Sequence, residues 1–200
     1  MPREFCDLLT LSIHRGGRDT PSRLLLVGAR LGYSYLGISL GRKPPGELPG
    51  IRAVPVAEEG TREARRATLN YARGGRARRA ASSGSADFII PDPRDRATLR
   101  FAAEGCVAVA YPYAQLITEG STKRSNLIRR WQEMHDNCRR FGCKELLVSS
   151  AGDSYLLRNP RDLSAMLHSC IGIGTEEALD WLSSNPREVL ERGEERWQSR

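Results

Sequence analysis

Metal-binding and redox motifs are scarce in this chain of 200 residues. It has only three histidines, His14, His135 and His168, and its five cysteines include no Cys-x-x-Cys pair. A multinuclear metal centre needs several converging His, Asp or Glu ligands, and structural zinc sites usually use closely spaced cysteines. The sequence therefore predicts no metal site, and it predicts that the cysteines are reduced and mostly buried.

Long apolar runs and aromatic residues are also scarce. No segment approaches the roughly 20 apolar residues of a membrane-spanning helix, and residues 1–4 lack the apolar stretch of a signal peptide. We therefore expect a cytoplasmic protein. Aromatic residues make up only 6% of the chain and do not follow the stacking pattern of single-strand nucleic-acid binders.

Signatures of other enzyme classes are weak. Ser149 and Ser150 do not lie in a Gly-x-Ser-x-Gly turn, so a serine nucleophile has no support. The segment 171–174 reads Ile-Gly-Ile-Gly before a helix, but it lacks the third glycine and the acidic partner of a dinucleotide site. The residues therefore predict no catalytic group in this chain.

The order of apolar and polar segments predicts an α/β fold. With 40% hydrophobic residues, the chain can form one domain over 1–200, near the lower size limit of an α/β barrel. Expected strands alternate with helices, which favours a parallel sheet wrapped by helices. We expect strands over 5–12, 34–40, 51–57, 68–73, 87–91, 106–111 and 146–150, helices over 20–31, 76–82 and 94–104, a Gly/Pro linker over 41–50, and closing helices from 175 and over 186–200.

A longer helix is predicted between the last two strands. Its apolar residues recur at spacings of four, three, four and three, which is typical of a helix with one face on a core. Lys123 and Arg124 lie on its other faces and form a candidate RNA-binding surface, although a solvated face would look the same. The apolar stripe comprises Leu127, Trp131, Met134, Cys138 and Phe141.

Positive charge is concentrated in one segment. The net charge is +7, and residues 61–80 contain seven arginines and one acid, Glu63, a local balance of 7 − 1 = +6. A charge run is often only a solvated face, but a cluster holding nearly all the net charge is typical of a surface that binds a phosphate backbone. The candidate RNA-binding residues here are Arg73, Arg76, Arg78 and Arg79.

A second candidate site follows the last predicted strand. The strand ends in the small residues 149–152, and Asn159-Pro160 is typical of a helix start. Arg158 and Arg161 lie at this start, where the helix dipole does not stabilise a cation, so they suggest an anionic partner. The alternative is that they form surface ion pairs with Asp153 and Asp162.

Several short motifs resemble the archaeal and eukaryotic family of ribonuclease P protein component 3. The most distinctive are Ser149-Ser150-Ala151-Gly152 and the segment 157–163, Leu-Arg-Asn-Pro-Arg-Asp-Leu. Weaker matches are Phe5-Cys6-Asp7-Leu8, Leu31-Gly32-Tyr33, Asp87 to Pro91, and Gly74-Gly75 with Arg79-Ala80-Ala81. The chain departs from the family in its Gly/Pro segment at 41–50 and in the order Ala151-Gly152.

The resemblance implies a fold similar to that of barrel phosphoesterases of the PHP type, with a mostly parallel sheet. The His-x-His of those enzymes is absent from strand one, which reads Asp-Leu-Leu-Thr-Leu over 7–11. The implied function is a protein subunit of ribonuclease P, which removes the 5′ leader of precursor tRNA. Asp7, Ser149 and Ser150 belong to the family motifs.

The resemblance also implies a division of labour and partners. The RNA component and its Mg²⁺ would carry out the chemistry, and the protein would bind no cofactor. Its partners would be the ribonuclease P RNA, precursor tRNA and other protein subunits, chiefly the small ferredoxin-like component 2. Two alternatives remain open: a degenerate barrel metallohydrolase with a site around Asp7, Asp87 and Ser149, and a general RNA-binding scaffold.

Overall fold

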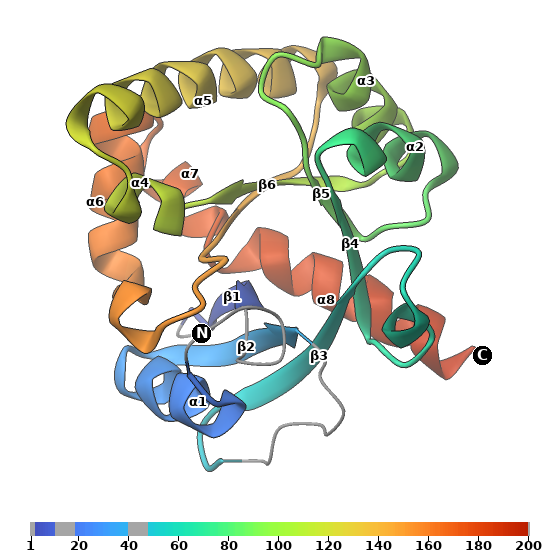
Figure 1. Ribbon diagram of the computed structural model, residues 1–200, viewed down its shortest axis with the longest axis vertical. Coiled ribbons are helices and arrows are strands. Elements are labelled where there is room, and N and C mark those ends of the chain that lie inside the picture. Colours follow the sequence, from blue (N-terminus) through green and yellow to red (C-terminus); the bar gives the residue numbers. More distant parts are fainter. Residues whose placement is uncertain (1–2, 11–18, 40–47, 200) are drawn as a thin grey trace.

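Seven parallel strands form one sheet in the order in which they occur in the chain (Figure 1). The computed structural model describes residues 3–10, 19–39 and 48–199. Most of the expected 41–50 linker and the end of the first expected strand lie outside these residues. The strands are β1 (Phe5–Thr10), β2 (Tyr33–Ser39), β3 (Arg52–Glu58), β4 (Leu69–Arg73), β5 (Phe88–Ile90), β6 (Ala108–Pro112) and β7 (Glu145–Val148).

Helices surround this sheet and connect most of its strands (Figure 1). Three short elements were not among those expected: α4 (Ala114–Thr118) and the 3₁₀ turns η2 (Arg62–Arg65) and η3 (Ser154–Leu156). Segments of three to five residues are too short to show a helical period. The helices are α1 (Pro21–Arg30), α2 (Gly75–Ser83), α3 (Arg96–Glu104), α4 (Ala114–Thr118), α5 (Ser121–Phe141), α6 (Pro160–Ile171), α7 (Thr175–Asp180) and α8 (Ser184–Gln198), with 3₁₀ turns η2 (Arg62–Arg65) and η3 (Ser154–Leu156).

The sheet closes on itself where the segment after β7 meets β1. Thr10 and Ala151 form a parallel bridge, and the backbone N–H of Ser150 donates to the carbonyl oxygen of Leu9 at 2.8 Å. Ser150 adopts a positive φ of 50°, which turns the chain toward β1. The result is a nearly closed seven-stranded barrel, which confirms the predicted α/β barrel.

Helix α8 covers the end of the barrel at which the strands begin. Its Val189 and Leu190 pack with the residues that fill the barrel interior. Asn185 Nδ2 donates to the carbonyl oxygen of Glu145 at 2.7 Å, and Arg192 donates to that of Cys106 at 2.7 Å. Both acceptors lie at or before the start of a strand. The interior residues include Cys6, Leu8, Val54, Val56, Leu69, Tyr71, Phe88, Ala108, Ala110, Leu146 and Val148.

The apolar face of α5 packs against the outside of β6 and β7, as its spacing predicts. Trp131, Met134 and Cys138 are buried in the largest core cluster, with Leu127 and Phe141 packed at its edge. The prediction that the cysteines are mostly buried is wrong for three of the five. Cys6 and Cys138 are buried and Cys143 and Cys170 half-buried, while Cys106 is exposed with φ 52° at a turn after α3; all are free thiols.

Candidate nucleic-acid interface

The basic segment forms an exposed surface around the end of β4 and along α2. Helix α2 buries only alanines, Ala77, Ala80 and Ala81, so the arginines between them point outward. Gly74, at φ 56°, makes the sharp change from strand to helix. Arg73, Arg76, Arg78 and Arg79 are all exposed, and the structure therefore brings the four candidates onto one accessible surface, called here the α2 arginine surface.

An acidic side chain from the neighbouring strand lies beside this surface. Glu58, at the end of β3, has its Oε1 3.8 Å from Arg73 Nε and 3.5 Å from Arg76 Nη1. Because both arginines are more than half exposed, these ion pairs are weak and exchangeable. Arg78 lies over the ring of Phe101 at 5.9 Å, which fixes its direction. A phosphate could thus replace Glu58 as the partner of the first two arginines.

The candidates on α5 lie beside a shallow pocket rather than on the α2 arginine surface. Lys123 Nζ is 3.4 Å from Glu119, and Arg124 donates to the carbonyl oxygen of the same residue at 3.0 Å. The pocket, of about 270 Å³, is lined by these turns of α4 and α5 and includes Arg130, whose buried Nε has no hydrogen-bond partner among the described residues.

Arg158 is held more tightly than its position in the sequence suggests. Its N–H donates to the hydroxyl of Tyr113, and its carbonyl accepts from that of Tyr33 at 3.0 Å. The guanidinium bonds neither Asp153 nor Asp162 among the described residues; instead Nη1 donates to the carbonyls of Tyr155 and Leu157, at 2.5 and 2.9 Å. Part of its donor capacity is thus used locally, whereas Arg161 is exposed.

Asp7 and Ser149 close the barrel. Oδ1 of Asp7 accepts from the backbone N–H groups of Leu9 and Ser149, at 3.2 and 3.0 Å, and the hydroxyl of Ser149 donates to the carbonyl of Leu9 at 2.9 Å. Both side chains are buried. Burial raises the pKa of Asp7 to about 6, although its hydrogen bonds with Ser149 act in the opposite direction. We call this set of contacts the β1–β7 seam.

The structure does not bring Asp87 together with the seam. Asp87 precedes β5, whereas Ser149 follows β7, so in a parallel sheet the two lie toward opposite ends. Arg196 of α8 forms two bonds of 2.7 Å to Asp87, which also accepts from the N–H of Asn70 at 2.6 Å. The three residues of the alternative hydrolase site therefore do not converge.

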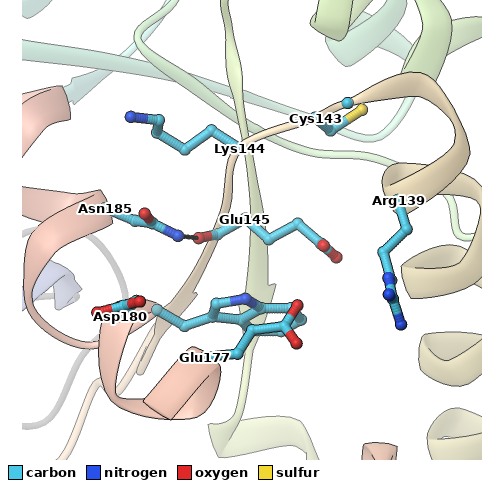
Figure 2. Close-up of a pocket in the computed structure, with 9 residues that line it drawn as sticks. Arg139, Cys143, Lys144, Glu145, Glu177, Asp180 and Asn185 are labelled. Atoms are coloured by element: carbon cyan, nitrogen blue, oxygen red, sulfur yellow. Dashed lines mark hydrogen bonds between the residues drawn. The ribbon is translucent and has the colours of Figure 1, made fainter. Parts of the chain in front are cut away.

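A buried polar cluster that the sequence did not indicate lies between α5, β7 and α7. Nδ1 of His135 is 3.1 Å from Oε2 of Glu145, and the hydroxyl of Tyr111 donates to Oε1 of Glu145 at 2.5 Å. One ligand atom each of His135, Glu145 and Glu177 lie within 4.8 Å of one another. A pocket of about 360 Å³ opens beside them, with the Glu145, Glu177 and Arg139 side chains around it (Figure 2).

The pKa values of Glu145 and His135 are both raised. Burial raises the pKa of Glu145, against the effect of its bonds from His135 and Tyr111. Burial also disfavours the charged form of His135, but the hydrogen bond and charge of Glu145 outweigh it, so the pKa of His135 is raised. The sequence suggested no functional role for His135. The available signal was its spacing from Trp131 and Cys138, which places it on the buried face of α5.

The fold and these surfaces define a class: an α/β barrel whose exposed arginines gather outside the barrel. Residues 91–198, more than half of the chain, match the family model described as RNase P subunit p30. The chain is also 30% identical over 214 residues to ribonuclease P protein component 3 of Methanothermobacter thermautotrophicus, covering 89% of this chain and 87% of that protein. The chain therefore belongs to this family of ribonuclease P protein subunits.

Solved structures support the fold. A chain of the cryo-EM structure of archaeal ribonuclease P with mature tRNA superposes with a TM-score of 0.74 at 12% identity, covering 95% of this chain and 91% of that one. An enzyme barrel is also similar: the A. niger ochratoxinase gives a TM-score of 0.60 at 9% identity, covering 94% of this chain and 71% of the enzyme. At these identities the likeness concerns the fold alone.

Proposed function

We propose that this chain acts as a subunit of ribonuclease P and supports the RNA component that removes the 5′ leader of precursor tRNA. Membership of the p30 family is the observation that carries the proposal. In this assignment the phosphodiester chemistry, with its Mg²⁺, belongs to the RNA, and the protein contributes binding surface and shape.

The hydrogen bonds of the polar groups at the barrel rim favour a structural role for this chain over a catalytic one. Enzymes with this architecture place reactive side chains at the carboxyl ends of the strands. Here Ser149 lies at that position, but its hydroxyl and backbone N–H bind Leu9 and Asp7. These groups stabilise the closed sheet, and two of the three residues of the hydrolase alternative are thereby occupied.

We assign RNA contact to the α2 arginine surface. Each arginine that neutralises a phosphate displaces condensed counterions, so binding falls as salt rises. Arg73, Arg76, Arg78 and Arg79 are exposed and carry four charges, of which Glu58 pairs with the first two and Asp95 lies near Arg78. Lys123, Arg124, Arg158 and Arg161 are assigned as secondary contacts.

The proposed partners are the ribonuclease P RNA, precursor tRNA and the small ferredoxin-like component 2, with the cytoplasm as the location. In the described part of the chain, no helix is both long and apolar enough to span a membrane. A general RNA-binding scaffold shares the arginine surface but would not act on tRNA maturation.

Reconstitution distinguishes these functions. Leader cleavage is measured with the RNA, with the partner proteins, and with or without this chain. We expect the chain to raise cleavage only when the RNA is present. Metal-dependent hydrolysis by the chain alone, lost in Asp7→Ala, would establish the hydrolase, and RNA binding without any effect on cleavage would establish the scaffold.

The arginine assignment has its own test. Replacing Arg73, Arg76, Arg78 and Arg79 by alanine should lower the slope of log affinity against log salt by roughly one unit for each of these arginines that binds a phosphate. Arg187→Ala is the control, because it removes an exposed arginine of α8 that pairs with Glu4 and Glu191, away from the α2 arginine surface. An unchanged slope in the folded fourfold variant would refute the assignment.

A further inference from the structure

The His135–Glu145 pair is rigidly positioned. Both side chains are about nine-tenths buried or more, and each also contacts an aromatic residue. The ring of Trp181 lies edge-on to the imidazole of His135 at 5.4 Å, and the hydroxyl of Tyr111 donates to Glu145. Three elements, α5, β6 and β7, therefore fix the direction of the imidazole and of one carboxylate.

A structural ion pair explains these two residues but not the third. Glu177, from α7, places a second carboxylate oxygen within 4.8 Å of the other two ligand atoms. Its carboxylate forms no hydrogen bond or ion pair with any residue in the ranges that the structure describes. Arg139 lines the same pocket, yet over those ranges it pairs with neither carboxylate. One imidazole and two carboxylates therefore meet at this pocket.

We propose that His135, Glu145 and Glu177 form a binding site for one divalent transition-metal ion of the Zn²⁺ type. One imidazole nitrogen and two carboxylate oxygens are a donor set that zinc accepts, and the nitrogen makes the site less suited to Mg²⁺ or Ca²⁺. Bonds of about 2.0 to 2.2 Å in tetrahedral geometry place neighbouring ligand atoms roughly 3.4 Å apart. His135 Nδ1 and Glu145 Oε2 are already 3.1 Å apart, and a ligand atom of Glu177 lies within 4.8 Å. Small side-chain movements would therefore bring the three ligands to these distances.

The surroundings provide the other features of a metal site. The Tyr111 hydroxyl bonded to Glu145 acts as an outer-shell donor that orients a ligand. The pocket of about 360 Å³ gives an entry path and room for a water molecule as the fourth ligand. Figure 2 shows the carboxylates of Glu145 and Glu177 directed toward this space.

The site is separate from the α2 arginine surface. Its three ligands come from α5, β7 and α7, whereas that surface lies at the end of β4 and along α2. A bound ion would connect α5, β7 and α7, so its expected effect is on the stability of this side of the barrel. The inference goes beyond the ribonuclease P assignment and does not depend on it.

Zinc titration of the chelator-treated full chain tests the site. By calorimetry we expect one Zn²⁺ per chain, and Glu177→Gln should weaken binding at least about tenfold. Glu177 is at the pocket rim, so this variant keeps the buried pair intact. Glu176→Gln is the matched control: it makes the same change on the same helix, but at an exposed residue paired with Arg3 at 2.5 Å. It should bind zinc like the unmodified protein.

Thermal unfolding gives a second readout. Zinc should raise the melting temperatures of the unmodified chain and of Glu176→Gln. It should raise the melting temperature of Glu177→Gln much less. Cys143 also lines the pocket, so Cys143→Ser identifies binding by a thiolate. The proposal is overturned if zinc binding is not saturable, if the two glutamine variants bind equally, or if Cys143→Ser abolishes binding while Glu177→Gln does not.

Discussion

Asp7 provides the sharpest test of how the barrel closes. Its Oδ1 accepts one backbone hydrogen bond within β1, from Leu9, and one across the seam, from Ser149. Its buried Oδ2 has no hydrogen-bond partner among the described residues. Burial is the largest influence on this group and raises its pKa from 3.8 to about 6. Asp7→Asn keeps an acceptor oxygen at the same place and removes the titration, so it isolates the effect of the charge.

The expected magnitude follows from the pKa shift. A folded pKa above the unfolded value means that the folded protein holds the proton more tightly than the unfolded chain. Between about pH 4 and pH 6, unfolding therefore releases a proton, and stability falls as the pH rises. A rise in the pKa of Asp7 from 3.8 to about 6 corresponds to roughly 3 kcal/mol in the free energy of unfolding, fully present below about pH 4 and lost above about pH 6.

Urea denaturation of both proteins at pH 4, 5, 6 and 7 measures this contribution. Other titrating groups are the same in both chains and cancel in the difference. In Asp7→Asn the side-chain amide nitrogen takes the position of the unpaired Oδ2, which adds an offset at every pH. From pH 4 to pH 7 the difference should move by about 3 kcal/mol in favour of Asp7→Asn. A difference that stays constant within about 0.5 kcal/mol would show that Asp7 is not desolvated as described.

Two further predictions concern α6 and α8. Asn159→Ala removes the helix cap, in which the Asn159 side chain accepts from the backbone N–H of Arg161 at 2.8 Å, and should lower the free energy of unfolding by about 1 kcal/mol. Arg158→Ala should lower it by less, but should reduce leader cleavage per folded molecule. Equal destabilisation with intact cleavage would make Arg158 structural. Gly193→Ala should cost about 1 to 3 kcal/mol, because its Cβ would lie 2.4 Å from Cδ2 of the buried Leu69 and 2.9 Å from the backbone oxygen of Thr68. Gly174→Ala is the control, since its Cβ would meet no atom within 4 Å. Equal melting temperatures of the two variants would contradict this packing.

Local signals made the fold predictable. Thr20-Pro21 and Asn159-Pro160 both start helices, with the Thr20 and Asn159 side chains accepting from backbone N–H groups as expected. Apolar runs located all seven strands within two residues where the structure describes them. Barrel closure could not be predicted in the same way, because the Asp7–Ser149 hydrogen bond joins residues 142 positions apart.

The candidate site was only partly accessible to sequence reasoning. Clustering located the arginines, but their acidic neighbour Glu58 is found only through the pairing of β3 with β4, where Glu58 lies opposite Tyr71. The backbone bonds of Arg158 to Tyr33 and Tyr113 likewise depend on tertiary packing. His135 carried a readable signal, since a histidine on an apolar helix face needs a buried partner. Glu145 did not, because the expected strand begins at 146, whereas β7 begins at Glu145.

The two ends of the barrel limit where this protein can act. At the end where the strands begin, Val189 and Leu190 of α8 pack into the interior, and Arg196 binds Asp87. At the other end, Asp7 and Ser149 hold the sheet closed instead of facing a substrate. Among the described residues, these polar groups at the two ends stabilise the barrel, whereas the α2 arginine surface lies exposed outside it. A large anionic partner such as a folded RNA suits exposed arginines of this kind, since it is recognised by its shape and its phosphates.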